Sequence, residues 1–295
     1  MADRRWRRAI AWLAILLCCV AWRAQAAPIA DDRGASVALP RPPQRVITML
    51  PSLAETVCEL GACDRLVAVD SFSDWPPPVR RLPRVGGVED ANIERIVSLK
   101  PDLVLLSATS PAIGRLQALG VPVFGVELKT LADVRRSLLA VGDVLQVPGA
   151  PAVWQRIEAG LAQAAATLPA AARGATVYFE VSAGPYAAGE SSHIGELLTR
   201  LGAANIVPAR LGSVPKLNPE FVVRADPQVI MLAAGIDRPL AERPGWLRIR
   251  AVREGRVCLL TAAESNVVSR PGPRLVEAAQ ILARCLQRTV ARGTP

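Results

Sequence analysis

The chain has 295 residues, of which 51% are hydrophobic, 21% are charged and 4% are aromatic. This composition is typical of a globular protein and excludes a disordered tail, a collagen and a coiled coil. The formal net charge is +9, but 32 of the 35 cationic residues are arginine, and no basic block lies outside the first eight residues. We therefore expect no nucleic-acid partner, because nucleic-acid-binding proteins concentrate positive charge on one face or stripe.

Residues 1–26 are typical of a cleavable export signal. Four arginines at the start precede an apolar run over residues 9–22, which is too short for a spanning helix of about 20 residues. Residues 24–26 (Ala-Gln-Ala) have the small-residue pattern of a cleavage site, so we expect cleavage near Ala26–Ala27. The mature charge is then +5, because five arginines and one aspartate leave with the signal. Cys18 and Cys19 leave a lipid anchor open as an alternative.

The first half of the mature chain alternates short apolar strands with helices. Strands are expected at residues 45–50, 66–69, 103–106 and 121–126, and helices at residues 52–60, 93–99 and 113–119. Ser52 and Glu55 have the spacing of a capping box at the start of the first helix. This alternation predicts a parallel sheet that is covered by helices on both faces.

The second half repeats this alternation. Strands are expected at residues 176–181, 229–232 and 257–260, and helices at residues 192–201, from 218 onward and at 273–286, with residues 263–273 preceding the last helix as a loop. Residues 92–106 align without gaps on residues 218–232, with five of fifteen positions identical. An internal match of this kind predicts two α/β lobes of related design.

An alanine-rich segment at residues 131–172 separates the two halves. It has no strand pattern, and residues 152–168 form one apolar helical face after Pro151, which suits the first turn of a helix. A helix of that length spans about 25 Å. The expected organisation is therefore a signal at 1–26, a lobe at 27–130, a linker with a backbone helix at 131–172, and a lobe at 173–295.

Four cysteines remain after signal cleavage, and exported compartments permit disulfides. Cys258 lies in a predicted strand and Cys285 in the last helix, which could pack on that sheet. Cys58 and Cys63 lie five residues apart around a helix end. Buried free thiols are the alternative for each pair. With one histidine and no CxxC motif, we expect no metal site.

Motifs of common enzyme classes are absent from the sequence. There is no G-x-S-x-G, no P-loop and no G-x-G-x-x-G after a strand. The single histidine, His193, lies beside Ser191 and Ser192 at a predicted helix start, which is not the arrangement of a catalytic triad. We expect no catalytic residues and no resident cofactor. An exported enzyme on the same scaffold is the alternative from a different class.

The loops after the predicted strands hold much of the scarce aromatic content, and ligands of α/β sheets bind at those strand ends. Phe72, Trp75 and Tyr186 offer flat apolar faces to a ligand, although Phe72 and Trp75 could equally pin their loop to its own lobe. Arg84 and Arg270, together with Arg274, are candidates for binding carboxylate or phosphate groups, with a solvated surface position as the alternative for each.

Glu94 and Glu220 occupy equivalent positions in the internal match. Each follows an asparagine, Asn92 or Asn218, that is expected to cap a helix. A carboxylate at a helix N-terminus is stabilised by the helix dipole, which is the structural explanation. The functional explanation is a pair of acidic groups, one on each lobe, that dock on a two-fold symmetric partner.

Five segments together resemble one known family. They are residues 45–55, 60–62 (Leu-Gly-Ala), 70–76 (Asp-Ser-Phe-Ser-Asp-Trp-Pro), 82–86 and 92–104. They are similar to the helical-backbone periplasmic receptors of ABC importers, which bind vitamin B12 and ferric siderophores. The resemblance covers residues 43–288 and is closest to the cobalamin branch, through residues 71–76 and 269–275. It implies two Rossmann-like lobes with central parallel sheets, one long backbone helix, a ligand cleft between the lobes and a periplasmic location.

The resemblance also implies roles for particular residues. Glu94 and Glu220 match the glutamates that dock on the inner-membrane permease dimer, and Phe72 matches a ligand-contacting aromatic. The family's cysteine near the end is matched by Cys285, with Cys258 as its candidate partner. Tryptophans expected six residues before each docking glutamate are replaced by Val88 and Val214.

The resulting hypothesis is a receptor that captures a corrinoid and delivers it to an ABC importer. Two other metal chelates are alternative ligands on the same fold. A ferric siderophore is favoured if Arg84 and Arg270 face the cleft. Haem is the other, with Tyr186 or His193 as the iron ligand.

Overall fold

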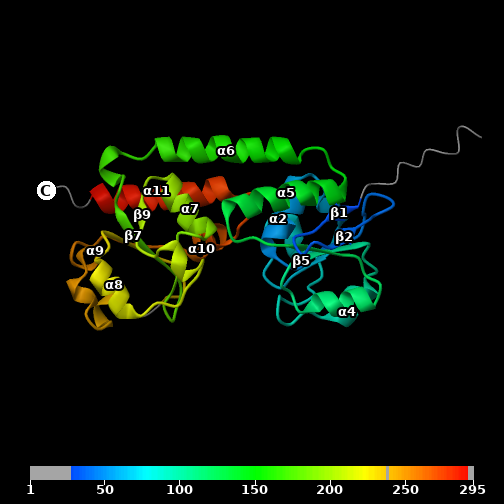
Figure 1. Ribbon diagram of the computed structural model, residues 1–295, viewed down its shortest axis with the longest axis horizontal. Coiled ribbons are helices and arrows are strands. Elements are labelled where there is room, and N and C mark those ends of the chain that lie inside the picture. The colour runs from blue at the N-terminus through cyan, green and yellow to red at the C-terminus, as the bar shows by residue number, and fades with distance from the viewer. Residues whose placement is uncertain (1–27, 237–238, 292–295) are drawn as a thin grey trace, which may run out of the picture.

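The computed structural model describes residues 28–236 and 239–291, so the expected export signal lies outside the described residues. Two α/β lobes lie side by side beneath a long helix, α6 (Ala150–Ala166), which bridges them (Figure 1). Among the described residues, no helix is both long and apolar enough to cross a membrane. The predicted fold class, two lobes with parallel sheets on a backbone helix, is confirmed.

The first lobe is built on a four-stranded parallel sheet in the order β4-β3-β5-β6. Its strands are β3 (Val46–Thr48), β4 (Leu66–Val69), β5 (Leu103–Ser107) and β6 (Val123–Val126). All but two of their residues are buried, as expected for a parallel sheet with both faces covered. A hairpin of β1 (Ile29–Ala30) and β2 (Ser36–Val37) precedes the sheet.

Helices cover both faces of the first sheet. One face packs on α2 (Pro51–Glu59) and α5 (Leu131–Leu145), in the same core as α6. The other face packs on α3 (Ile93–Ser98) and α4 (Ala112–Ala118). Alternation along β5 explains the division, because Leu103 and Leu105 belong to the first core, and Val104 and Leu106 to the second.

The second lobe repeats this sheet. Its parallel strands β9 (Ala204–Asn205), β7 (Thr176–Ser182), β10 (Val229–Leu232) and β11 (Val257–Leu259) lie in an order that matches β4-β3-β5-β6. A short antiparallel strand, β8 (Tyr186–Ala187), is added beside the end of β7. The helices are α7 (His193–Arg200), α8 (Pro219–Ala225), α9 (Arg250–Arg253), α10 (Ala262–Ser269) and α11 (Leu275–Ala291).

Short 3-10 helices connect these elements. They are η1 (Cys63–Arg65), η2 (Pro77–Arg81), η3 (Ala170–Ala172), η4 (Ala209–Leu211), η5 (Leu240–Glu242) and η6 (Trp246–Arg248).

The internal match in the sequence corresponds to equivalent structure. Its first copy contains α3 and β5, and its second contains α8 and β10. Both predicted caps form: Asn92 accepts from the amide of Arg95, and Asn218 accepts from the amide of Glu220. The related design of the two lobes is therefore a property of the fold.

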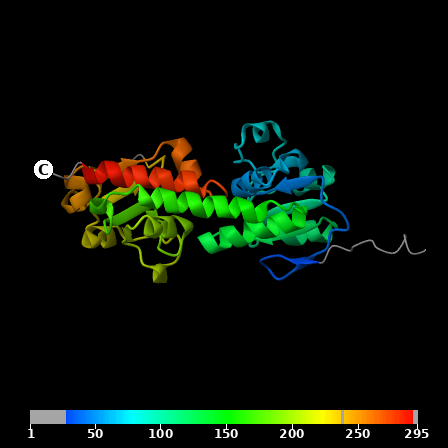
Figure 2. The same cartoon turned by 90° about the horizontal axis from the view of Figure 1, so that it is seen from above.

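The backbone helix α6 lies two residues N-terminal to its predicted position and packs lengthwise beside α11, as the view from above shows (Figure 2). Gly160 allows this approach, because a Cβ atom there would lie 2.6 Å from Cγ2 of Val276. Helix α5, which precedes α6 in the expected linker, packs on α2 and β1 of the first lobe. The residue boundaries of the domains remain a prediction.

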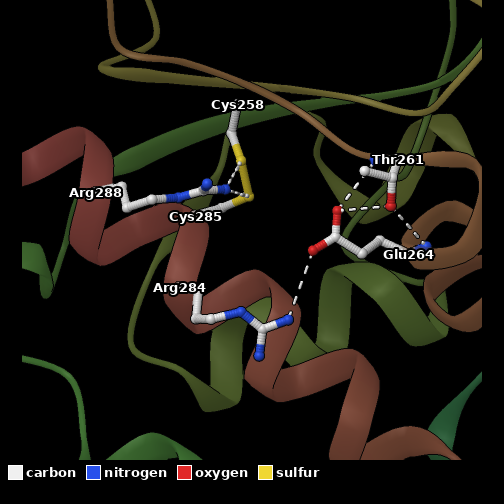
Figure 3. The surroundings of a disulfide bond; sticks show 6 residues. All are labelled: Cys258, Thr261, Glu264, Arg284, Cys285 and Arg288. Carbon is white, nitrogen blue, oxygen red and sulfur yellow. Dashed lines mark hydrogen bonds and ion pairs between the residues drawn. A yellow bond between two sulfur atoms is a disulfide. The ribbon is translucent and has the colours of Figure 1, made fainter.

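The structure contains two disulfides, Cys58–Cys63 in the first lobe and Cys258–Cys285 in the second. The second joins β11 to α11, as Figure 3 shows. Arg288 lies over this bond, with its Nη2 atom 3.2 Å from Sγ of Cys258. One turn earlier on α11, Arg284 pairs with Glu264 of α10 at 3.6 Å (Figure 3).

Two local predictions are wrong. The capping box of Ser52 and Glu55 does not form, because the helix begins one residue earlier at Pro51, and Ser52 lies inside its first turn. The expected loop at residues 263–273 is helical up to Ser269. A capping box does start that helix, between Thr261 and Glu264, whose carboxylate accepts from the Thr261 amide at 3.0 Å.

Candidate ligand-binding site

A cavity of about 410 Å³ lies at the carboxyl ends of the first lobe's strands, where it meets the second lobe. Its walls are residues 50–52 after β3, Phe72 after β4, residues 107–109 at the end of β5, residues 126–129 after β6, and residues 269–271 of the second lobe. Loops after parallel strands gather at one edge of the sheet, which explains this convergence. The volume falls within the range typical of small-molecule sites.

Phe72 forms the aromatic wall of the cavity, and its side chain is 71% exposed. The carboxylate of Asp70 holds the turn that carries Phe72. It accepts hydrogen bonds from the amide of Phe72 at 2.7 Å and from the hydroxyl of Ser73. Burial raises the pKa of the Asp70 carboxyl, and the hydroxyl bond opposes this. The segment therefore presents Phe72 outward instead of packing it into the first lobe.

Arg84 supports this segment from behind. Its Nη1 atom donates to the carbonyl oxygens of Asp70 and Ser73, at 3.0 and 2.5 Å. Arg84 is not among the described residues that line the cavity. Its position corresponds to neither of the two alternatives that the sequence left open, a ligand contact and a solvated surface residue.

Arg270 lines the cavity, but its guanidinium already has protein partners. It is 9% exposed, and Nη1 lies 3.0 Å from Oε1 of Glu55 and 2.6 Å from Oδ1 of Asp74. Its Nη2 atom donates to the carbonyl oxygen of Phe72 at 3.1 Å. Burial raises the pKa of the Glu55 carboxyl, while the hydrogen bond from Arg270 acts against this. Arg270 therefore joins the second lobe to two segments of the first, and a solvated surface position is excluded.

Trp75 lies next to this cluster and is 42% exposed. The guanidinium carbon of Arg274 lies 4.8 Å from the centre of its ring, within the range of a cation–π contact. Arg274 also pairs with Glu277, one turn ahead on α11, at 2.8 Å. Phe72 thus faces the cavity, and Trp75 contacts the neighbouring lobe instead of pinning the segment to its own lobe.

The charges around the cavity are paired within the protein. Lys129 pairs with Glu127, and Arg270 pairs with Glu55 and Asp74. The remaining polar groups of the lining are hydroxyls, from Ser52, Ser107, Thr109 and Ser269. Such a surface suits a ligand with a broad apolar face and neutral hydrogen-bonding groups, because the cationic side chains of the lining are already paired with carboxylates.

Tyr186 and His193 lie outside the described cavity lining. Tyr186 is on β8 of the second lobe and is 40% exposed. His193 is buried at the first turn of α7, where Nε2 lies 3.0 Å from the carbonyl oxygen of Val268. Burial lowers the pKa of the His193 imidazole, and the carbonyl contact opposes this. His193 thus lies at a helix start, as predicted, and is a buried contact between α7 and α10.

Glu94 and Glu220 are exposed in the first turns of α3 and α8, one on each lobe. Neither carboxylate has an ion pair or a hydrogen bond with another described residue, so both are available to a partner. Val214 is 49% exposed and Val88 is half-buried, and neither provides an aromatic face. Within the described residues, no cluster of His, Cys, Asp and Glu side chains could hold a metal ion.

Sequence reasoning missed Glu55 and Asp74 as partners of Arg270. Glu55 fitted a capping box, and Asp74 lies in a loop with no pattern of its own. The two partners of the Glu55–Arg270 pair are separated by 215 positions, so no local spacing could reveal it. The polar strand end at residues 107–109 was detectable, because it follows a predicted strand that ends at this edge.

Fold and site together define a two-lobed binding protein with a cavity at the lobe junction. A family model described as "Periplasmic binding protein" matches residues 46–264. The match covers most of the chain, and the protein therefore belongs to this family, which is a family of binding proteins and not of enzymes.

Relatives in this family cover most of the chain. It is 28% identical to an uncharacterized ABC transporter substrate-binding lipoprotein of Bacillus subtilis, over 88% of this chain and 84% of the relative. It is 29% identical to a cobalamin-binding protein of Halobacterium salinarum, over 88% and 73%, respectively. It is also 29% identical to a vitamin B12-binding protein of Pectobacterium carotovorum, over 84% and 89%.

Solved structures share the two-lobed fold. The periplasmic vitamin B12 binding protein BtuF of Vibrio cholerae superposes with a TM-score of 0.67 at 25% identity, over 84% of this chain and 98% of that one. The periplasmic heme-binding protein BhuT, solved with two hemes, superposes with a TM-score of 0.70 at 28% identity, over 83% and 98%.

Proposed function

We propose that this protein is a periplasmic receptor that captures a corrinoid and delivers it to an inner-membrane ABC importer. The observation that carries the proposal is the cavity at the lobe junction, with an exposed Phe72 as one wall and internally paired charges around it. A corrinoid has a broad ring with neutral amide side groups, which suits apolar contact and hydroxyl partners. The relatives named as cobalamin-binding and vitamin B12-binding proteins support this choice.

A ferric siderophore fits this site less well. That ligand class needs unpaired cations for its acidic groups, and two arginines were the candidates. Arg84 donates to backbone carbonyls, and Arg270 is engaged by Glu55 and Asp74. The metal in a corrinoid or a siderophore complex is part of the cargo, so the proposal requires no resident cofactor.

Haem is the second candidate, and the 28% identity to the heme-binding protein BhuT favours it. Its iron would need an axial ligand such as a tyrosine or histidine. Tyr186 and His193 both lie outside the described cavity lining, and the latter is buried among α7, α10 and Lys129. The geometry therefore supports the corrinoid over haem.

Docking and export complete the proposal. The exposed, unpaired carboxylates of Glu94 and Glu220 would each accept an arginine of the permease dimer, one per lobe. Residues 1–26 would direct the chain to the periplasm and be removed there. The mature protein would then start at residue 27 and carry both lobes.

The experiment is to isolate the protein from its native periplasm and to record the absorbance spectrum and mass of whatever copurifies. We expect the absorption bands of a corrin and one equivalent of cobalt. A Soret band with iron would identify haem and overturn the corrinoid proposal, and iron without a Soret band would identify a siderophore.

A further inference from the structure

The segment over residues 70–76 belongs to the first lobe, but its tip is held by the second lobe. Arg270 donates to the carbonyl oxygen of Phe72 and to the carboxylate of Asp74. Arg274 lies over the ring of Trp75. Three residues of one segment are therefore contacted across the lobe boundary by two arginines that lie four positions apart.

These contacts matter because core packing does not hold Phe72. At 71% exposure, the direction of its side chain depends on its backbone. Two hydrogen bonds fix that backbone, one from its amide to Asp70 in the same lobe and one from Arg270 to its carbonyl oxygen. Loss of the second bond would leave the Phe72 backbone held from the first lobe alone.

The two arginines are themselves rigidly placed. Oε1 of Glu55, which is buried in α2, lies 3.0 Å from Nη1 of Arg270 and 3.7 Å from Nη1 of Arg274. Between the arginines, Gly272 packs closely against α2, and a Cβ atom there would lie 3.2 Å from Cβ of Ser52. The turn at residues 270–274 is therefore closely packed against α2 of the first lobe.

We propose that Arg270 and Arg274 are positioning residues, through which the second lobe sets the place of the Phe72 wall in the first. They act on ligand affinity through Phe72, and the contact of Arg274 with Trp75 holds the same segment. Separation of the lobes breaks their contacts and loosens the wall, so lobe opening and ligand release are coupled. This inference rests on the proposed function only in one respect, which is that the second test uses cyanocobalamin as the ligand.

The first test needs no ligand. Hydrogen exchange, read by mass spectrometry, is compared for the wild-type mature protein, Asp74→Asn and Arg274→Leu. Asp74 is half-exposed, so Asp74→Asn replaces the charged hydrogen bond from Arg270 with a weaker neutral one and leaves the buried Glu55–Arg270 pair intact. We expect amides of residues 71–75 to exchange about tenfold faster in both variants. Unchanged exchange there would overturn the proposal.

The matched control is Arg200→Gln. This arginine also lies in the second lobe and forms a surface pair, with Glu158 of α6 at 2.9 Å. Its removal should leave the exchange of residues 71–75 as in the wild type. If Arg200→Gln accelerates that exchange equally, the effect is a general loosening of the molecule, and the proposal fails.

The second test is a double-mutant cycle on the affinity for cyanocobalamin. Asp74→Asn should weaken binding about tenfold, because a neutral hydrogen bond replaces a charged one. In the Phe72→Ala background the same change should have no further effect, because it acts through Phe72. Additive losses would overturn the proposal. If the wild type binds no cyanocobalamin, the corrinoid proposal fails. The hydrogen-exchange test still decides whether Arg270 and Arg274 position the Phe72 wall.

Discussion

In the first lobe the chain passes from β3 directly into α2, whereas in the second lobe the hairpin strand β8 follows β7 before α7 begins. The two sheets otherwise have the same strand order. The end of β3 opens onto the ligand cavity, but near the end of β7 the buried Glu180 pairs with Arg243 at 2.6 Å. A repeated fold has thus been used in two ways, with a binding wall in one lobe and an internal ion pair in the other.

The lobes are equivalent, however, in what they present to a partner. If Glu94 and Glu220 dock on a two-fold permease, replacing both with alanine should abolish uptake of cobalt-labelled cyanocobalamin by the native cells, the largest effect that we expect. Each single change should reduce uptake to a similar extent. Affinity for the ligand, measured by calorimetry, should change less than about twofold in all three variants. Glu89→Ala, an exposed carboxylate nearby, is the control and should leave uptake unchanged.

The two buried ion pairs should differ in function but not in stability. Glu55→Ala and Glu180→Ala each take the buried carboxylate partner from an arginine, so each should lower the free energy of unfolding by about 3–5 kcal/mol. Only Glu55→Ala should also weaken cyanocobalamin binding, because Arg270 then loses its anchor. Denaturant unfolding and calorimetry give the two quantities. Equal loss of affinity in both variants would contradict the division of labour between the lobes.

The disulfides allow a comparison of the same kind. Cys258 and Cys285 are separated by 27 positions, and Cys58 and Cys63 by five. Chain-entropy arguments predict that replacing Cys258 and Cys285 with serines lowers the free energy of unfolding by about 3.5 kcal/mol. Replacing Cys58 and Cys63 should lower it by about 2 kcal/mol. Thermal unfolding of the two double variants measures the difference. A larger loss from the Cys58–Cys63 pair would show that packing, not loop closure, sets these contributions.

The aromatic residues of the two lobes should contribute unequally to binding. Phe72→Ala removes a cavity wall and should weaken cyanocobalamin binding about tenfold, or about 1.4 kcal/mol. Tyr186→Ala, on β8, should change the affinity less than about threefold. Calorimetry on both variants gives the ratio. A stronger effect at Tyr186 would move the binding surface toward the second lobe.

The smallest effect concerns pH. Because burial lowers the pKa of His193 in the folded protein, the unfolded chain binds a proton first as the pH falls through about 6.5. Its contribution to stability is therefore present at neutral pH and is lost as the pH falls toward the lowered value. His193→Gln should flatten this part of the dependence. Denaturant unfolding of the wild type and of His193→Gln, at about five pH values between 7.5 and 5, would measure how the free energy of unfolding of each protein depends on pH. An unchanged slope would contradict the expectation.

Much of the fold could be predicted from the sequence. The apolar runs of residues 66–69 and 229–232 coincide with β4 and β10, because strands buried on both faces leave a continuous hydrophobic signal. The internal match predicted the second lobe, and the two asparagine caps formed as expected.

The site was less predictable, because its geometry depends on contacts between distant residues. Arg270 and Phe72 were identified as candidates, and both line the cavity. The partners of Arg270, Glu55 and Asp74, come from the other lobe, and no local pattern linked them to it. Tyr186 had the right chemistry in the right type of loop, but the β7–β8 hairpin places it outside the described cavity lining.

The most direct test of the central claim is calorimetric titration of the mature protein, residues 27–295, with cyanocobalamin and, in parallel, with haemin. We predict saturable binding of one cyanocobalamin per chain, weakened by Phe72→Ala, and no stoichiometric binding of haemin. Absence of heat with cyanocobalamin, together with one-to-one binding of haemin that Phe72→Ala leaves intact, would contradict the corrinoid receptor.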